Sequence, residues 1–130
     1  MITNPIREVR TLEERIPDAE LKVMKVLWRD GECGAKHIAE ALAKEEGWNI
    51  NTTYTLIKRC VKRGVIERIE PNFICRAKVS KKEIQDERTN ELIDKMFEGS
   101  VDGLFAALLD GKKLSRSEIE NLKKLVDKLG

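Results

Sequence analysis

The sequence predicts a mostly α-helical protein with one small β-hairpin. Between residues 17 and 79, three helical patterns are followed by two short runs of β-branched and aromatic residues. Residues 80–130 carry three further helical patterns and no such run. Helix, helix, helix, hairpin is the element order of a winged helix-turn-helix domain. We therefore expect an N-terminal arm (1–16), a winged-helix DNA-binding domain (17–79) and a helical dimerisation domain (80–130).

The first two helices have clear boundaries. The arm contains Pro5, alternating charges and few apolar residues, so we expect it to be weakly ordered. Pro17-Asp18-Ala19-Glu20 opens the first helix, because proline and acidic residues are favoured in a first turn, and Asp30-Gly31 ends it. A second, short helix is expected to begin at Gly34 and to end before Gly47. The predicted inward positions of the two helices are Leu21, Met24, Leu27, Trp28, Ile38, Ala41 and Leu42.

The third helix is the most informative segment. Asn49 is a good N-cap residue, and Gly64 is a suitable C-terminal glycine. Between them, four residues share one face at positions i, i+3, i+4 and i+7, namely Thr53, Leu56, Ile57 and Cys60. The opposite face and its flanks carry amides, hydroxyls and cations, from Asn51, Tyr54, Thr55, Lys58, Arg59, Lys62 and Arg63.

Such a surface suits the major groove of DNA. Asparagine can read adenine, and arginine can read guanine, while lysine and threonine can reach phosphates. We assign phosphate contacts to Lys58, Lys62 and Arg63, base edges to Asn51, Tyr54, Thr55 and Arg59, and a backbone contact to Lys36 in the second helix. The alternative is an amphipathic surface helix whose basic residues are simply solvated.

The charge distribution supports the first interpretation. The net charge of +2 is too small to indicate nucleic-acid binding by itself. Between residues 51 and 68, however, the segment contains five basic residues and a single acidic one, Glu67. The β-rich runs 65–69 and 73–79 flank Glu70-Pro71-Asn72, which predicts a hairpin whose tip lacks basic residues.

The C-terminal region predicts self-association. Ser80 caps a helix over 81–98, Gly99-Ser100 breaks it, and a short apolar helix runs to Asp110-Gly111. Ser115 and Glu118 form a capping box at the start of the last helix. So short a region cannot cover its own apolar surface, and pairing with the same region of a second chain would do so. The expected interface comprises Leu92, Met96, Phe97, Leu104, Phe105, Leu108, Leu109, Ile119, Leu122, Leu125 and Val126.

Two other arrangements of this region remain open. The helices could pack back onto the N-terminal domain of their own chain. They could instead bind a different protein, in which case the chain would be a protein-interaction regulator and a monomer in isolation.

Other classes of function find little support in the sequence. No phosphate-binding glycine loop, nucleophile elbow or acid–base pair occurs, so we expect no enzyme and no cofactor. Cys33 and His37 lie one turn apart, but zinc requires four ligands, or three and water, so no metal is expected. Three widely spaced cysteines and the absence of a signal or membrane segment indicate a cytoplasmic protein with reduced thiols and no membrane insertion.

Several motifs resemble the BlaI/MecI penicillinase-repressor family, which includes copper-responsive repressors. They are Asp18-Ala19-Glu20-Leu21-x-Val23-Met24-x-Val26-Leu27-Trp28, Ala35-x-x-Ile38, Gly47-Trp48 with Thr52 and Thr55, Lys62-Arg63-Gly64-Val65-Ile66-Glu67-Arg68, Phe97-x-Gly99-Ser100 and Leu114-Ser115-x-x-Glu118-Ile119-x-x-Leu122. The resemblance implies a homodimeric winged-helix repressor that binds a palindromic operator. It places the DNA-contacting helix on Asn51, Thr52, Tyr54, Thr55, Lys58 and Arg59.

The resemblance also implies how such repressors are released. In antibiotic-responsive members, a membrane sensor-protease triggers cleavage within the dimerisation domain. The family's Asn-Phe bond falls here at Ala107-Leu108, which we name as the candidate cleavage site. The paired C-terminal cysteines of the copper-responsive members are absent.

Overall fold

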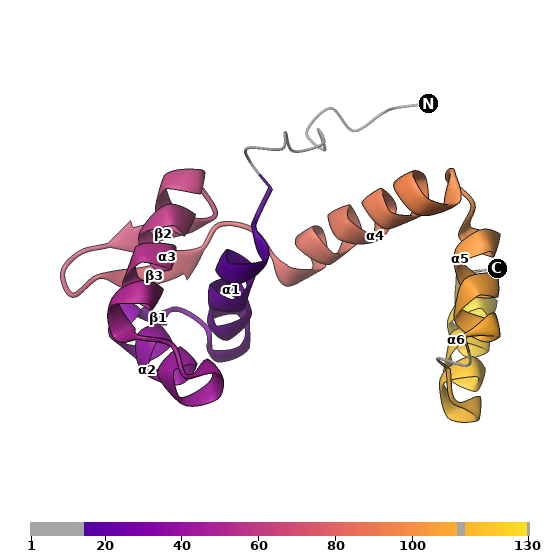
Figure 1. The fold of residues 1–130 in the computed structure, drawn as a ribbon, viewed down its shortest axis with the longest axis horizontal. Coiled ribbons are helices and arrows are strands. Elements are labelled where there is room, and N and C mark those ends of the chain that lie inside the picture. The colour runs from indigo at the N-terminus through magenta and orange to yellow at the C-terminus, as the bar shows by residue number, and fades with distance from the viewer. Residues whose placement is uncertain (1–14, 112–113, 130) are drawn as a thin grey trace. The chain divides into compact units, whose positions relative to one another are not determined.

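The fold consists of six helices and three short strands over the residues described by a computed structural model, 15–111 and 114–129 (Figure 1). In chain order the elements are α1 (Asp18–Asp30), β1 (Cys33–Gly34), α2 (Ala35–Glu46), α3 (Ile50–Arg63), β2 (Ile66–Ile69), β3 (Ile74–Ala77), α4 (Lys81–Phe97), α5 (Val101–Asp110) and α6 (Arg116–Leu129). The chain divides into two compact units that meet between Gln85 and Asp86, inside α4. The predicted fold class is confirmed, because the first unit has the helix order and hairpin of a winged helix.

The sheet has one more strand than the predicted hairpin. Its order is β1-β3-β2, with both pairs antiparallel. In β1, Cys33 lies opposite Cys75, and Gly34 opposite Ile74. The prediction that the second helix begins at Gly34 was wrong by one residue, because Gly34 is extended (φ −71°, ψ 151°) and precedes α2 as its N-cap. A strand of two residues is too short to show an alternating pattern in sequence.

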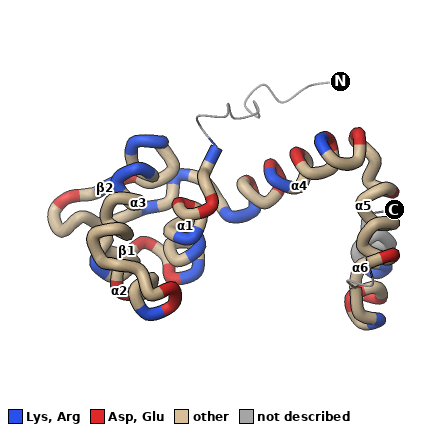
Figure 2. The backbone as a smooth tube through the Cα atoms, viewed as in Figure 1, with Lys and Arg blue, Asp and Glu red and all other residues tan. Residues whose placement is uncertain are grey.

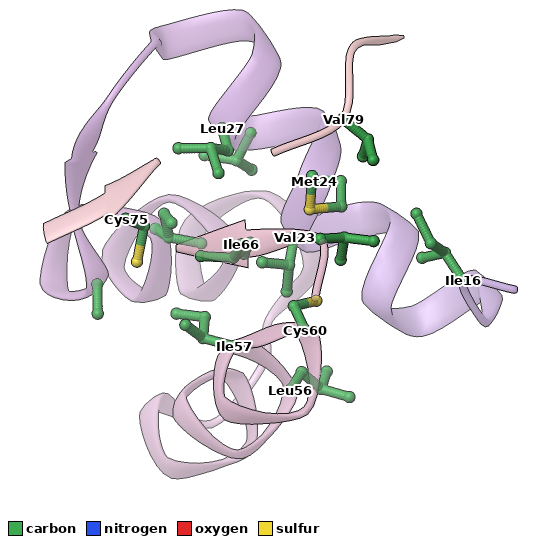
Figure 3. Packing of buried hydrophobic residues seen from close by; sticks show 14 of the residues in the cluster. Ile16, Val23, Met24, Leu27, Leu56, Ile57, Cys60, Ile66, Cys75 and Val79 are labelled. Carbon is green, nitrogen blue, oxygen red and sulfur yellow. The ribbon is translucent and has the colours of Figure 1, made fainter. Parts of the chain in front are cut away.

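The core of the first unit lies between the three helices and the sheet (Figure 3). Val23, Met24 and Leu27 of α1 meet Ile57 and Cys60 of α3, and Ile66 and Cys75 enter from the strands. Trp28, by contrast, is only partly buried at the edge of this core. Its indole Nε1–H donates a hydrogen bond of 2.9 Å to the carbonyl oxygen of Val79, so α1 is tied to the segment that follows the hairpin.

The first compact unit includes the beginning of α4. Ser80 Oγ accepts a hydrogen bond from the backbone N–H of Glu83 at 3.0 Å, which starts α4. One turn later, Ile84 is 4% exposed and belongs to the core cluster. The beginning of α4 is therefore part of the winged-helix unit.

The second unit contains the rest of α4 with α5 and α6. Ser100 caps α5 by accepting from the N–H of Gly103 at 3.0 Å. The predicted capping box of α6 is confirmed: Ser115 Oγ accepts from the N–H of Glu118, and Glu118 Oε1 accepts from the N–H of Ser115. In residues 86–111 and 114–124, whose side chains the structure describes, none is fully buried.

Within the described residues, no helix combines the length and the apolar character needed to cross a membrane.

Candidate nucleic-acid interface

Helix α3 has the boundaries and the buried face that its sequence predicts. Asn49 Oδ1 accepts a hydrogen bond of 2.8 Å from the backbone N–H of Asn51, which caps the N-terminus. Gly64 adopts a left-handed conformation (φ 87°) and ends the helix. The four residues predicted to face inward are all buried, and they are Thr53, Leu56, Ile57 and Cys60.

The opposite side of α3 is exposed and cationic. The exposed residues of this surface are Asn51, Thr52, Thr55, Lys58, Arg59 and Lys62, which we call the polar face of α3. Helix α3 contains no acidic residue, and its basic residues lie in its C-terminal half (Figure 2). Thr55 Oγ1 donates to the carbonyl oxygen of Asn51 at 3.0 Å, which orients that hydroxyl along the helix. Lys36 is exposed in the first turn of α2.

Tyr54 lies at the edge of this surface and is half-buried. Its ring meets Phe73 edge to face, with 6.0 Å between the centroids. The guanidinium carbon of Arg68 in turn lies 3.7 Å from the centroid of the Phe73 ring. Tyr54 therefore connects α3 to the hairpin, a role that the sequence prediction did not include.

Arg63 occupies a different environment from the other basic residues of α3. Its Nε and Nη2 groups donate to the two carboxylate oxygens of Glu20, at 2.8 and 3.0 Å. The side chain of Glu20 is 3% exposed and that of Arg63 19% exposed. Hydrogen bonding to Glu20 raises the pKa of Arg63 above its usual value. The guanidinium assigned to phosphate by its sequence position is thus directed toward α1.

Glu20 was missed as a functional candidate, although the sequence contains a signal for it. Glu20, Val23, Met24 and Leu27 share the i, i+3, i+4, i+7 stripe of α1, so the acid falls on the apolar face. A carboxylate on a buried stripe requires a cationic partner or hydrogen-bond donors. The sequence does not show which cation that is, because the partner lies 43 positions away.

The hairpin's basic residues are paired with acids. Arg76 forms ion pairs with Glu32 at 2.7 Å and Glu67 at 3.5 Å, and Arg68 pairs with Glu70. These pairs reduce the net positive charge that the hairpin presents, whereas Lys58, Arg59 and Lys62 of α3 have no ion-pair partner among the described residues.

His37, one of the two residues considered as metal ligands, contacts an acidic side chain. His37 Nε2 lies 2.8 Å from Asp30 Oδ2, and Arg29 also bonds the carboxylate of Asp30. Arg29 and His37 together hold the pKa of Asp30 well below its usual range. Burial raises the pKa of the Cys60 thiol to about 12 and that of Cys75 to about 11. Cys75 lies on a hairpin strand, as expected, but its side chain is in the core.

A three-helix unit with an antiparallel wing and an exposed cationic third helix is a winged-helix nucleic-acid-binding domain. Comparison with known proteins narrows this class. The family model described as "Penicillinase repressor" matches residues 16–128, and this chain belongs to that family. The family's members are transcriptional repressors, which confirms the predictions of family and of a non-enzymatic role.

Individual relatives agree with this assignment. The chain is 30% identical to the methicillin resistance regulatory protein MecI of Staphylococcus aureus (strain N315) over 115 residues, which cover 87% of this chain and 94% of MecI. It is 23% identical to the penicillinase repressor of Bacillus licheniformis, over 87% of this chain and 90% of that protein. The solution structure of the DNA-binding domain of the repressor BlaI aligns with a TM-score of 0.50 and 25% identity, covering 57% of this chain and 93% of that domain.

Proposed function

We propose that this protein is a homodimeric transcriptional repressor that places α3 of each subunit in the major groove of a palindromic operator. The observation that carries the proposal is the polar face of α3, which is exposed, free of acids and borne on a helix whose other face is anchored in the core. Family membership supports a repressor role. The methicillin and penicillinase regulators named above suggest that the target genes include resistance functions.

The contacts proposed for DNA follow from chemistry and exposure. Lys58 and Lys62 would neutralise phosphates, as would Lys36 from α2. Asn51, Thr55 and Arg59 are the proposed readers of base edges, with Thr52 beside them. Tyr54 would present only its hydroxyl edge, because its ring contacts Phe73.

Dimerisation through the second unit is supported by the exposure of its apolar side chains. Helix α5 has no buried residue, although seven of its ten residues are apolar. Leu92, Met96, Val101 and Leu109 are 45%, 66%, 50% and 52% exposed. Such apolar exposure within one short unit is typical of a surface that a second protein covers. A second copy of the same unit would cover it symmetrically and match a two-fold operator.

The other proposed interface residues agree with this arrangement. Six of them are half-buried, namely Phe97, Leu104, Phe105, Leu108, Ile119 and Leu122. Leu125 and Val126 belong to α6, but their side chains fall outside those that the structure describes.

Release from DNA would require a change in the dimerisation domain. The candidate cleavage site, Ala107-Leu108, lies within α5, with Ala107 exposed and Leu108 half-buried. Helix α5 would have to unwind before a protease could cut that bond, because a scissile bond must be reached outside a regular helix. Proteolytic release through a membrane sensor-protease is therefore coupled in this proposal to local unfolding of α5.

One experiment tests both halves of the proposal. Duplex sequences are selected from a random library with the full-length protein, and its mass in solution is measured by light scattering with and without the selected duplex. The expected result is a palindromic site bound by two chains. A monomer that selects no sequence would favour the alternative, a regulator whose C-terminal helices bind a different protein.

A further inference from the structure

We propose that the Glu20–Arg63 ion pair positions α3 on α1, so that Arg63 controls the discrimination between DNA sequences without contacting DNA. This inference rests on the proposed function above and adds a positioning residue to it. It reverses the sequence-based assignment of Arg63 to phosphate.

The geometry of the pair is directional. Two N–H groups of one guanidinium meet both oxygens of one carboxylate, at 2.8 and 3.0 Å. A bidentate contact of this kind fixes an angle as well as a distance. It joins the first turn of α1 to the last residue of α3.

The pair also neutralises a buried charge. Glu20 is enclosed by the core, and a buried carboxylate without a partner is strongly unfavourable. Cys60, one turn before Arg63, brings its Sγ to 3.9 Å from Glu20 Oε1. One buried acid thus meets two residues on the same side of α3, which determines how that helix is rotated about its axis.

The apolar contacts of α3 specify this rotation less sharply. Two of its four buried side chains are small, Thr53 and Cys60. The Thr53 hydroxyl is buried, and within the described residues it has no hydrogen-bond partner. Thr53 therefore contributes no directional contact on the buried face, and the contact of Cys60 Sγ with Glu20 is long at 3.9 Å, so the shorter, bidentate ion pair is the stronger directional contact of α3 with α1.

A rotation of α3 would act directly on the polar face. Asn51, Thr55 and Lys62 project from the side of the helix opposite its buried residues. Base-edge hydrogen bonds tolerate little displacement, whereas phosphate attraction falls off gradually with distance. Loss of the pair should therefore weaken sequence discrimination more than electrostatic attraction to DNA.

The test compares four variants of the full-length protein: Glu20→Gln, Arg63→Ala, Arg63→Lys and, as the matched control, Lys62→Ala. Dissociation constants for the selected operator and an unrelated duplex of equal length are measured over a series of salt concentrations. We expect Glu20→Gln, Arg63→Ala and Arg63→Lys each to lower the ratio of the two affinities about tenfold per half-site, the size of one mismatched base pair. The salt slope should stay unchanged in Arg63→Ala and fall by about one per half-site in Lys62→Ala.

Two results would overturn the inference. The first is a reduced salt slope in Arg63→Ala with an unchanged affinity ratio and rescue by lysine, which identifies a phosphate contact. The second is a lower melting temperature with both DNA parameters unchanged, which identifies a purely stabilising pair. Circular dichroism identifies variants that fail to fold. If Glu20→Gln does not fold, Arg63→Lys still tests the inference, because lysine keeps the charge and loses the bidentate contact.

Failure of the proposed function has a separate outcome. If the wild-type protein selects no DNA sequence, that function is rejected. The positioning role is then measured by amide hydrogen exchange in the free protein. Relative to the wild type, Arg63→Lys should increase the exchange rate more in α3 than in α2. Unchanged exchange in α3 would contradict the inference.

Discussion

Tyr54 of α3 packs edge to face on Phe73, the residue immediately before β3, with ring centroids 6.0 Å apart. This contact links the helix that we propose for the groove to the wing, and Arg68 lies on the Phe73 ring next to it. The wing is thus placed by an aromatic contact with α3 as well as by its backbone pairing with β1.

The Tyr54–Phe73 contact should be measurable as a coupling free energy. Tyr54→Ala and Phe73→Ala, alone and together, should show a coupling of about 0.5–1.5 kcal/mol in urea denaturation. Tyr54→Phe keeps the ring, so it should leave stability nearly unchanged. Additive effects of the two alanine substitutions would exclude a direct contribution of this pair.

Lys62 should contribute charge to DNA binding and little sequence selectivity. Removing an exposed lysine that faces phosphate lowers the salt slope by about one per half-site and weakens all duplexes alike. Binding measured by fluorescence anisotropy at four or more salt concentrations checks this. Lys44, exposed near the end of α2, provides a control whose removal should not change the slope. If Lys62→Ala keeps the salt slope of the wild type, Lys62 does not contact phosphate.

Arg59 should behave differently, because we assign it to a base edge. Arg59→Ala should cost about 1–3 kcal/mol per half-site on the operator and much less on unrelated DNA. Repeating the sequence selection with the variant should show relaxed preference at one position of each half-site. An equal loss on both duplexes would reassign Arg59 to phosphate.

The apolar surface of the second unit should be needed for self-association. Met96 is the most exposed large apolar residue named there, at 66%, so Met96→Glu should not disturb the winged-helix unit. In the dimer it would bury a charge, and light scattering should report a shift toward monomer with an unchanged circular dichroism spectrum. Lys95→Glu, at the exposed neighbouring position, serves as the control. If Met96→Glu dimerises as strongly as the wild type, this surface is not part of the dimer interface.

The buried thiol of Cys60 should make stability depend on alkaline pH. Burial raises its pKa from 9.0 to about 12 in the folded protein. Between these values the unfolded chain has released the proton and the folded chain retains it, so the free energy of unfolding falls as pH rises. The stabilisation from the protonated, buried thiol is fully present below about pH 9 and is lost as the pH rises toward 12. Urea denaturation across pH 8–11 should show a shallower decline in Cys60→Ala than in the wild type, and equal declines would contradict the assignment.

Much of the fold could be predicted from local signals. The N-cap Asn49 and the left-handed Gly64 bracket α3 where expected, and Ser115 with Glu118 starts α6. Periodicity also identified the buried face of α3. Strand β1 escaped prediction because its two residues are extended only through pairing with β3.

Local spacing also predicted the exposure of some DNA-binding candidates correctly but not the direction of others. Lys58, Arg59 and Lys62 are exposed, as helical periodicity requires for residues opposite a buried stripe. Arg63 and Tyr54 fall on the flanks of that face, where periodicity leaves the direction of a long side chain open. Their partners, Glu20 and Phe73, come from other elements and decide where the two side chains point.

The sequence by itself determined the order of the helices, the wing and the cationic surface of α3, because these follow from spacing, capping and composition within a few consecutive residues. Only the tertiary structure decided that Arg63 faces a buried acid and that Tyr54 joins the wing. Residues far apart in the chain become neighbours only when the core assembles, and no local pattern records which pairs will meet.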